Sequence, residues 1–240
     1  MKSYLETEKL NKNYGSFEAV KNMNVHVNKG DVYGLIGPNG AGKTTLMKML
    51  VGLATPTGGR IIINGDNGNE AKIGCLIESP GIYGNLDAVA NMTLKAKAQG
   101  VYNKQEILNI LDFVGLTNAI HKKAGKYSLG MKQRLGIAMA LIGEPDILIL
   151  DEPINGLDPQ GIIEVRELIQ KLSTERNMTI MISSHILGEL QKVANVFGII
   201  SGGHLIMEVS AEELKEQYAS DSESLEEFYL DVIQKGKKVC

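Results

Sequence analysis

The sequence predicts an α/β fold built on a mainly parallel β-sheet. Apolar segments of strand length alternate along the chain with segments of helical periodicity, which is typical of parallel βαβ units. A block of helical periodicity from about 86 to 145 interrupts this alternation and indicates an inserted subdomain. The 240 residues are 43% hydrophobic and 22% charged, so the chain is long enough and apolar enough to bury a substantial core.

Each expected element rests on the spacing of its apolar residues. Met23, Val25 and Val27 alternate with polar residues, which predicts one half-buried strand over 22–28. Residues 104–114 instead repeat apolar positions at helical spacing, which predicts an amphipathic helix. The other expected strands lie at 32–36, 60–63, 147–150, 178–183, 196–200 and 205–209, the last two as a hairpin, and the other helices at 44–53, 88–99, 132–142 and 161–172.

Charge and cysteine content narrow the class of protein. With 25 basic and 28 acidic residues the net charge is −3, which disfavours a basic protein that coats nucleic acid. The sequence contains no apolar run near 18 residues and no apolar signal segment at its start, so we expect neither a membrane-spanning helix nor a secretory signal. Two cysteines argue against a disulfide framework and fit a reducing cytoplasm.

A phosphate-binding loop follows the strand expected at 32–36. The sequence GPNGAGKT at 37–44 matches the pattern G-x-x-x-x-G-K-[ST] and precedes an expected helix, whose N-terminus favours anions. Lys43 supplies a positive charge for the outer phosphates, and the Thr44 hydroxyl is placed to ligate Mg²⁺. The residues expected to contact the nucleotide or its metal are Gly37, Pro38, Asn39, Gly40, Ala41, Gly42, Lys43, Thr44 and Thr45.

A second candidate site is acidic. The apolar strand at 147–150 ends in Asp151 and Glu152. Ligands of open α/β sheets bind beyond the carboxyl ends of the strands, so both carboxylates should reach the rim that carries the phosphate loop. We expect Asp151 to hold Mg²⁺ through water, and Glu152 to orient and deprotonate the attacking water. The alternative is a pair of solvated acids that only ends a buried strand.

Three more features complete an ordered set. Ser128 and Gly130 begin an expected helix, Asp158 lies in a turn after the acidic strand, and His185 ends the next strand. In this order, from about 5 to 209, the chain strongly resembles the ATP-binding-cassette (ABC) ATPases, the nucleotide-binding subunits of ABC transporters. The resemblance implies a P-loop NTPase fold of the ABC type, α/β with an antiparallel β edge and an inserted α-helical subdomain.

The resemblance also implies roles for single residues. Tyr14 is similar to the aromatic residue that stacks on adenine, and the alternative is a half-buried strand tyrosine. Ser128 and Gly130 resemble the signature motif that contacts the γ-phosphate of ATP held by the opposite subunit. Asp158 resembles the residue that links the two sites across a dimer. His185 resembles the switch histidine that contacts the γ-phosphate, and the alternative is a structural histidine.

Two departures from the family pattern stand out. The signature usually reads Ser-Gly-Gly-Gln, whereas residues 128–131 read SLGM, which we interpret as a mark of a subtype. Glu78 stands where the family has a glutamine that senses Mg²⁺ and the attacking water. We predict that Glu78 takes that catalytic and metal-sensing role and slows or reshapes the hydrolytic switch; the alternative is a side chain that points to solvent. The surrounding string IESPGIYGNL resembles cassettes that export, or confer immunity to, lantibiotics and bacitracin.

The resemblance further implies ligands, partners and a domain division. ATP and Mg²⁺ are the expected cofactors. The expected partners are a second copy or a related ATPase subunit, paired head to tail, and a separate membrane permease that holds the chain at the cytoplasmic face of the cell membrane. No nucleic acid is expected. The expected divisions are an ATP-binding core with a β-subdomain at 1–85 and 146–210, a helical subdomain at 86–145, and a tail at 211–240 with a link at 220–224 and a short helix at 225–233.

Several alternatives stay open at this level. The tail could serve as a dimer contact, a regulatory arm or a disordered end. Ile82, Tyr83 and Leu86 are either contacts for the permease or core of the helical subdomain. In the favoured hypothesis the chain powers the export of a peptide antibiotic or drug through a separate permease. In the second it is a soluble ATPase that acts on a ribosome, nucleic acid or other cytoplasmic assembly, and in the third it is a small-molecule P-loop kinase. The third leaves Ser128 and His185 unexplained.

Overall fold

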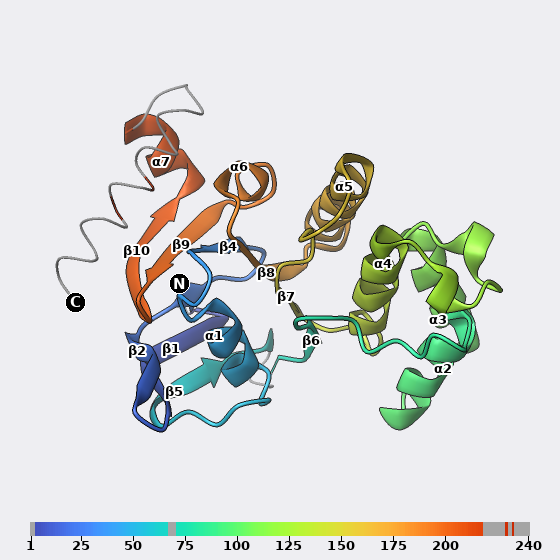
Figure 1. Cartoon of the computed structure of the whole chain (residues 1–240), viewed down its shortest axis with the longest axis horizontal. Helices are drawn as coiled ribbons and strands as arrows, with labels where there is room; N and C mark the ends of the chain where they lie inside the picture. Colours follow the sequence, from blue (N-terminus) through green and yellow to red (C-terminus); the bar gives the residue numbers. More distant parts are fainter. Residues whose placement is uncertain (1–2, 67–70, 218–228, 230–231, 233–240) are drawn as a thin grey trace.

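The computed structural model describes residues 3–66, 71–217, 229 and 232 (Figure 1). Its strands are β1 (Leu5–Tyr14), β2 (Phe17–Met23), β3 (His26–Val27), β4 (Val32–Ile36), β5 (Gly58–Ile63), β6 (Ile73–Leu76), β7 (Ile147–Leu150), β8 (Thr179–Ser184), β9 (Val196–Ser201) and β10 (His204–Ser210). Its helices are α1 (Lys43–Leu50), α2 (Ala88–Ala98), α3 (Lys104–Phe113), α4 (Leu129–Ala140), α5 (Pro159–Arg176), α6 (Leu187–Leu190) and α7 (Ala211–Gln217), with short 3₁₀ turns at Thr117–Ala119 and Ala124–Lys126.

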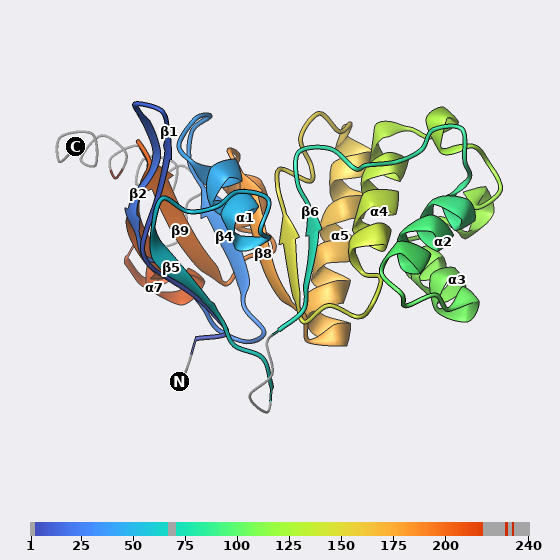
Figure 2. The ribbon, with the colours of Figure 1, turned by 90° about the horizontal axis from the view of Figure 1, so that it is seen from below.

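The strands form two sheets. The larger has the order β10-β9-β4-β8-β7-β6 and is parallel except for β10, which runs antiparallel to β9 at one edge. In the smaller sheet β1 pairs antiparallel with β2, β3 and β5. Helices α2, α3 and α4 pack on one another at the far end of the molecule from β10 (Figures 1 and 2). The predicted α/β fold with an antiparallel edge and inserted helices is confirmed.

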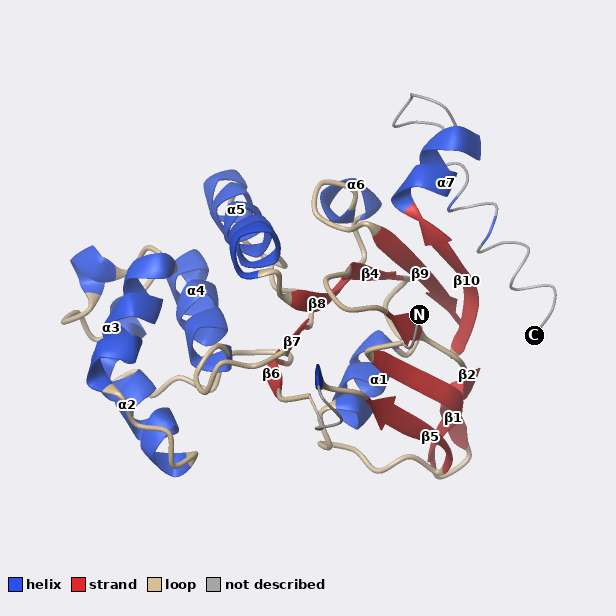
Figure 3. Cartoon of the chain, turned by 180° about the vertical axis from the view of Figure 1, so that it is seen from behind, coloured by secondary structure: helices blue, strands red, loops and turns tan. Residues whose placement is uncertain are grey.

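Alternation along the central strands gives the large sheet two buried faces. On β4, Val32 and Ile36 belong to a core shared with α5, α6 and the helices α2 to α4, whereas Tyr33 and Leu35 belong to a core shared with α1 and the smaller sheet. All five residues of β4 are buried, as expected of a parallel strand covered on both sides. This packing places the loop after β4 at the sheet rim, beside α1 (Figure 3).

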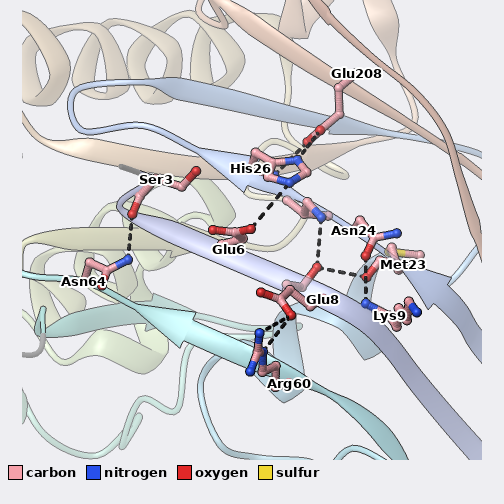
Figure 4. A network of polar contacts seen from close by, with 12 residues as sticks. Ser3, Glu6, Glu8, Lys9, Met23, Asn24, His26, Arg60, Asn64 and Glu208 are labelled. Carbon is pink, nitrogen blue, oxygen red and sulfur yellow. Dashed lines mark hydrogen bonds and ion pairs between the residues drawn. The ribbon is translucent and has the colours of Figure 1, made fainter. Parts of the chain in front are cut away.

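A polar network joins the smaller sheet to the edge of the larger one (Figure 4). His26 on β3 contacts Glu208 on β10 through its ring Nδ1, at 2.8 Å, and its backbone N–H donates to the same carboxylate at 2.9 Å. The buried hydroxyl of Tyr33 also donates to Glu208, at 2.7 Å. Burial and this carboxylate together raise the pKa of Tyr33 well above its usual value, so the phenol stays protonated.

The prediction of one strand over 22–28 is wrong. Strand β2 ends at Met23 and β3 begins at His26. Asn22 has a positive φ of 45°, and the backbone N–H of Val25 donates to the Thr7 hydroxyl, at 2.9 Å, so the regular ladder is interrupted between them. The alternation of apolar and polar residues continues through this interruption, so the sequence pattern does not reveal it.

Two helices begin earlier than predicted because of their caps. Helix α4 begins at Leu129 instead of 132, since the Ser128 hydroxyl accepts a hydrogen bond from the backbone N–H of Met131 at 3.2 Å. Helix α5 begins at Pro159 instead of 161, with Asp158 as its cap. The remaining expected strands and helices are confirmed: the bounds of β4 and β7 agree with the prediction, and the ends of the others differ by at most three residues.

Part of the tail can be described. After β10 the chain forms α7, and the buried Val232 and partly buried Tyr229 pack against the core that includes Val209 and Leu214. The link expected at 220–224, and the helix expected at 225–233 except for Tyr229 and Val232, lie outside the described residues. Among the helices that the structure describes, none combines the length and apolar character needed to cross a bilayer.

Candidate nucleotide site

The loop from Gly37 to Gly42 is shaped by close backbone contacts. Gly40 and Gly42 have positive φ values of 80° and 108°, which glycine adopts without strain. A Cβ on Gly42 would lie 2.6 Å from the carbonyl oxygen of Ala19, and one on Gly37 only 2.4 Å from that of Ile200. The glycines therefore allow the loop to be clamped between β2 and β9 at the start of α1.

A pocket opens directly on this loop. Its lining residues are Phe17, Ala19, Asn39, Gly40, Ala41, Gly42, Lys43, Thr44, Thr45 and Glu152. Seven of the nine residues expected from the motif are in this set. Gly37 and Pro38 contribute differently, because their carbonyl oxygens accept hydrogen bonds from the Lys43 ammonium at 2.6 and 3.3 Å. The pocket thus joins a cation and the N-terminus of α1, a combination that binds phosphate.

Thr44, which lines the pocket, contacts Asp151. The Thr44 hydroxyl donates to the Asp151 carboxylate at 2.8 Å, and Asp151 is almost fully buried. Hydroxyl and carboxylate oxygens are the donors that Mg²⁺ prefers, and this ion usually takes one or two carboxylates together with substrate phosphates. The pair therefore fits a magnesium ion held beside the phosphates. When bound, Mg²⁺ would neutralise charge on the phosphates during their transfer.

Ser183 organises both acidic residues, although the motifs did not assign it a role. Its hydroxyl donates to Asp151 Oδ1 at 2.7 Å and accepts from the backbone N–H of Glu152 at 2.8 Å. Strand β8 lies between β4 and β7, so a side chain at its carboxyl end reaches the strand ends on either side. The signal in the sequence was a polar residue that ends a buried strand two positions before His185.

Glu152 and His185 form a contact pair at the pocket wall. The Nδ1 atom of His185 lies 2.9 Å from Glu152 Oε2, while Glu152 Oε1 lies 3.4 Å from the Lys43 ammonium. Glu152 Oε1 is buried and accepts no hydrogen bond from the residues that the structure describes. A carboxylate held by an imidazole through one oxygen, with the other oxygen near the Lys43 ammonium at a phosphate loop, can orient a water molecule and accept its proton.

Glu78 is placed at the border of this site. Its carboxylate accepts a hydrogen bond from Lys48 on α1 at 2.6 Å and is mostly exposed. Glu78 is not among the residues that line the pocket. Within the described part of the chain, no three acidic, histidine or cysteine side chains gather in a metal-binding group, so Glu78 does not join Asp151 and Glu152 in one cluster.

Two aromatic rings lie beside the pocket. Tyr14 and Phe17 are paired across β1 and β2, which places their side chains on one face of the smaller sheet. Phe17 lines the pocket, whereas Tyr14 does not; the ammonium of Lys12 lies 4.9 Å from the Tyr14 ring centre. Both rings are at least half exposed, so a planar base could stack on either.

Ser128, Gly130 and Asp158 lie together, away from the pocket. Asp158 accepts from the backbone N–H of Gly161 at 3.0 Å, and a Cβ on Gly130 would lie 3.7 Å from Gly161 Cα. The N-termini of α4 and α5 therefore form one surface. In Figures 1 and 2 the start of α4 lies across β6 and β7 from α1, so these three residues do not complete the phosphate pocket of the same chain.

Comparison with known proteins defines the class. The family model described as "ABC transporter" matches residues 20–155, which is more than half of the chain. The fold and the match together show that the chain belongs to this family, as an ATP-binding subunit that binds ATP with Mg²⁺ and hydrolyses it. A small-molecule kinase is thereby excluded.

The chain is similar to several known ABC transporter proteins. The chain is 49% identical to the bacitracin transport ATP-binding protein BcrA of Enterococcus faecalis over 89% of this chain and 71% of that protein. It is 47% identical to the lantibiotic transport ATP-binding protein SrtF of Streptococcus pyogenes over 95% of this chain and 97% of that protein. Among solved structures it resembles cbiO1 of Clostridium perfringens, part of the ABC transporter complex cbiONQ, with a TM-score of 0.78 and 26% identity over 92% of each chain.

Proposed function

We propose that this chain powers the export of a peptide antibiotic of the bacitracin or lantibiotic type through a separate membrane permease. Two relatives described as bacitracin and lantibiotic transport proteins share nearly half of their aligned residues with it, and this observation carries the substrate class. Both are described as transport proteins, which favours a transporter over a soluble ATPase that acts on a ribosome or nucleic acid. In this role the chain is peripheral, at the cytoplasmic face of the cell membrane.

In this proposal the nucleotide pocket and the surface at the starts of α4 and α5 have different roles. Lys43, Thr44 and Asp151 bind the phosphates and Mg²⁺, while Glu152, held by His185, accepts the proton of the attacking water. The surface formed by Ser128 and its neighbours completes the site of a second copy, or of a related ATPase subunit, in a head-to-tail dimer. Closure of that dimer on ATP and its opening after hydrolysis would drive the permease.

Glu152→Gln tests the chemistry. An amide cannot accept the proton, so hydrolysis should fall by at least about a hundredfold while ATP affinity stays close to that of the wild type. ATP should then hold the variant as a dimer that elutes earlier from a sizing column. Phosphate release at the wild-type rate would dismiss Glu152 as the base.

Affinity capture from detergent-solubilised native membranes tests the transporter. The tagged chain should retain a multi-span protein, and deletion of that protein's gene should raise susceptibility to a peptide antibiotic. The Tyr83 side chain is exposed and its backbone is bonded to Asn91 of α2, so Tyr83→Asp should lose the permease. Met207→Asp, at an exposed apolar residue of β10, should keep it. Recovery of ribosomes or assembly factors alone would instead support the soluble alternative.

Glu78 has its own place in this proposal. We expect it to act where the family has glutamine, so Glu78→Gln should change turnover or its Mg²⁺ dependence in the presence of the permease. Turnover and Mg²⁺ dependence identical to those of the wild type would dismiss this role.

A further inference from the structure

Glu78 brings an extra negative charge close to a site that must bind an anion. It follows β6, and the backbone of β6 is tied to the metal site, because Leu76 accepts a hydrogen bond from the N–H of Asp151 at 2.8 Å. Glu78 has a positive φ of 60°, which turns the chain directly after the strand. Glu78 lies outside the pocket, but its carboxylate and that of Asp151 both act on Lys48, so it adds negative charge to the surroundings of the site. Like charges oppose the binding of phosphates unless a cation compensates.

Lys48 is placed to provide that compensation. It lies on α1 four residues after Thr44, one helical turn further on the same side of the helix. Its ammonium donates to the Glu78 carboxylate at 2.6 Å. This hydrogen bond raises the pKa of Lys48, and the nearby Asp151 carboxylate and Tyr14 phenol act in the same direction. Lys48 is therefore a stable cation whose environment includes both the Glu78 carboxylate and the metal-site carboxylate.

We propose that Lys48 is a positioning residue that neutralises Glu78 and holds its carboxylate at the edge of the nucleotide site. In this arrangement the chain can carry a glutamate at the switch position without losing affinity for ATP. The inference rests on the proposed function, because it takes Thr44 and Asp151 as the metal site. A neutral glutamine at 78 would remove the need for Lys48, so the two residues should act as a unit.

A double-mutant cycle tests this dependence. Lys48→Gln, Glu78→Gln and the double variant would be compared by calorimetric titration with ATP and Mg²⁺ at low ionic strength. Lys48→Gln should weaken binding by about fivefold, and high salt should shrink the loss because exposed charges are screened. Adding Glu78→Gln should restore the wild-type affinity. Glu78→Gln alone should bind at least as tightly as the wild type.

Matched controls separate this effect from simple loss of an ion pair. Arg60→Gln breaks an exposed pair with Glu8 of the same 2.6 Å length on the smaller sheet and should leave binding unchanged. Melting curves should show that all variants fold. Lys43→Ala must abolish ATP binding; if it does not, the proposed nucleotide site itself fails.

Two results would overturn the inference while leaving the nucleotide site intact. One is wild-type affinity in Lys48→Gln at low salt. The other is an equal loss in Lys48→Gln and in the double variant, since that would show that Lys48 acts on the nucleotide directly and not through Glu78.

Discussion

At the scale of single residues, the motifs locate the charged groups, but neutral side chains hold them in place. Lys43, Thr44, Asp151 and Glu152 are visible in the sequence because their chemistry is tied to a pattern. Motifs do not identify Ser183, because a buried serine at a strand end carries no charge and fits no motif. Its two short hydrogen bonds nevertheless fix Asp151 and the backbone of Glu152.

Ser183→Ala should therefore impair turnover more than binding. The change leaves the N–H of Glu152 without its partner and frees one oxygen of Asp151, a cost of about 1–3 kcal/mol. We expect kcat to fall about tenfold with a small change in KM for ATP, measured by steady-state phosphate release. Ser184→Ala is the control, because the Ser184 hydroxyl is bonded to the backbone of Ile186 and not to an acidic residue of the described chain. Equal losses in both variants would mean that Ser183 matters for folding alone.

Phe17 is a second residue that the motifs did not identify. It lines the pocket beside the phosphate loop, so it should contact the base of a bound nucleotide. Since the chain has no tryptophan, Phe17→Trp introduces a single fluorescent probe. ATP should change its emission, whereas inorganic tripolyphosphate, which has no base, should not.

Phe17→Ala gives the matching affinity measurement. Loss of one stacked ring should lower the affinity for ATP by about tenfold and leave the affinity for tripolyphosphate unchanged. Tyr14→Ala, measured in parallel, shows how much the Tyr14 ring, on the neighbouring strand, contributes to ATP affinity. If ATP leaves the fluorescence emission of the Phe17→Trp protein unchanged, residue 17 does not contact the base.

At the scale of elements, periodicity predicts the buried strands well and the smaller sheet poorly. Strands β4 and β7 are apolar throughout, and their boundaries agree with prediction because burial on both faces leaves a simple signal. The strand expected over 22–28 is instead divided, because Asn22 and the Thr7 hydroxyl interrupt the ladder. The helix starts were missed by two or three residues because a cap acts through one hydrogen bond and leaves the apolar pattern unchanged.

The contact between β4 and β9 depends on a residue without a side chain. A Cβ on Gly198 would lie 2.1 Å from the Tyr33 hydroxyl, and Tyr33 is fully buried with that hydroxyl bonded to Glu208. Gly198→Ala should lower the free energy of unfolding by about 2 kcal/mol, because the core must shift to admit the methyl group. Urea denaturation measures this cost.

Gly188→Ala is the control, because the space at this helical position is open. It should be neutral or slightly stabilising, since alanine favours a helix over glycine. Equal stability of the Gly198→Ala protein and the wild type would show that the core around Tyr33 admits the methyl group without cost.

At the scale of the whole molecule, the order of the motifs was the most informative feature of the sequence. It predicted the family and the α/β architecture, because each motif is tied to a strand end or a helix start. It could not predict that Glu78 pairs with Lys48, since that contact depends on how a loop turns after β6. The resemblance assigned Ser128 to the ATP of the opposite subunit, but the surface that Ser128 forms with Asp158 depends on the packing of α4 against α5.

That placement predicts that two copies share each ATP site. Ser128 and Asp158 cap α4 and α5, which lie across β6 from α1 (Figure 2), and neither residue lines the pocket at the phosphate loop. In the proposed head-to-tail dimer, two-fold pairing would bring each surface to the loop of the partner. Lys43→Ala and Ser128→Arg chains should each be nearly inactive as ATPases, because each homodimer then lacks the same component in both sites.

A mixture of the two variants should regain activity. In an equal mixture about half of the dimers are mixed, and each of these has one intact site, so about a quarter of the wild-type rate should return. A mixture of Lys43→Ala with Asp151→Asn is the control, because both changes damage the same half of the site and a mixed dimer has no intact site. Recovery of ATPase activity in the first mixture, with no activity in the second, would support the head-to-tail arrangement. Silence in both, with folded chains, would mean that Ser128 acts on the site of its own chain or that this chain does not pair with itself.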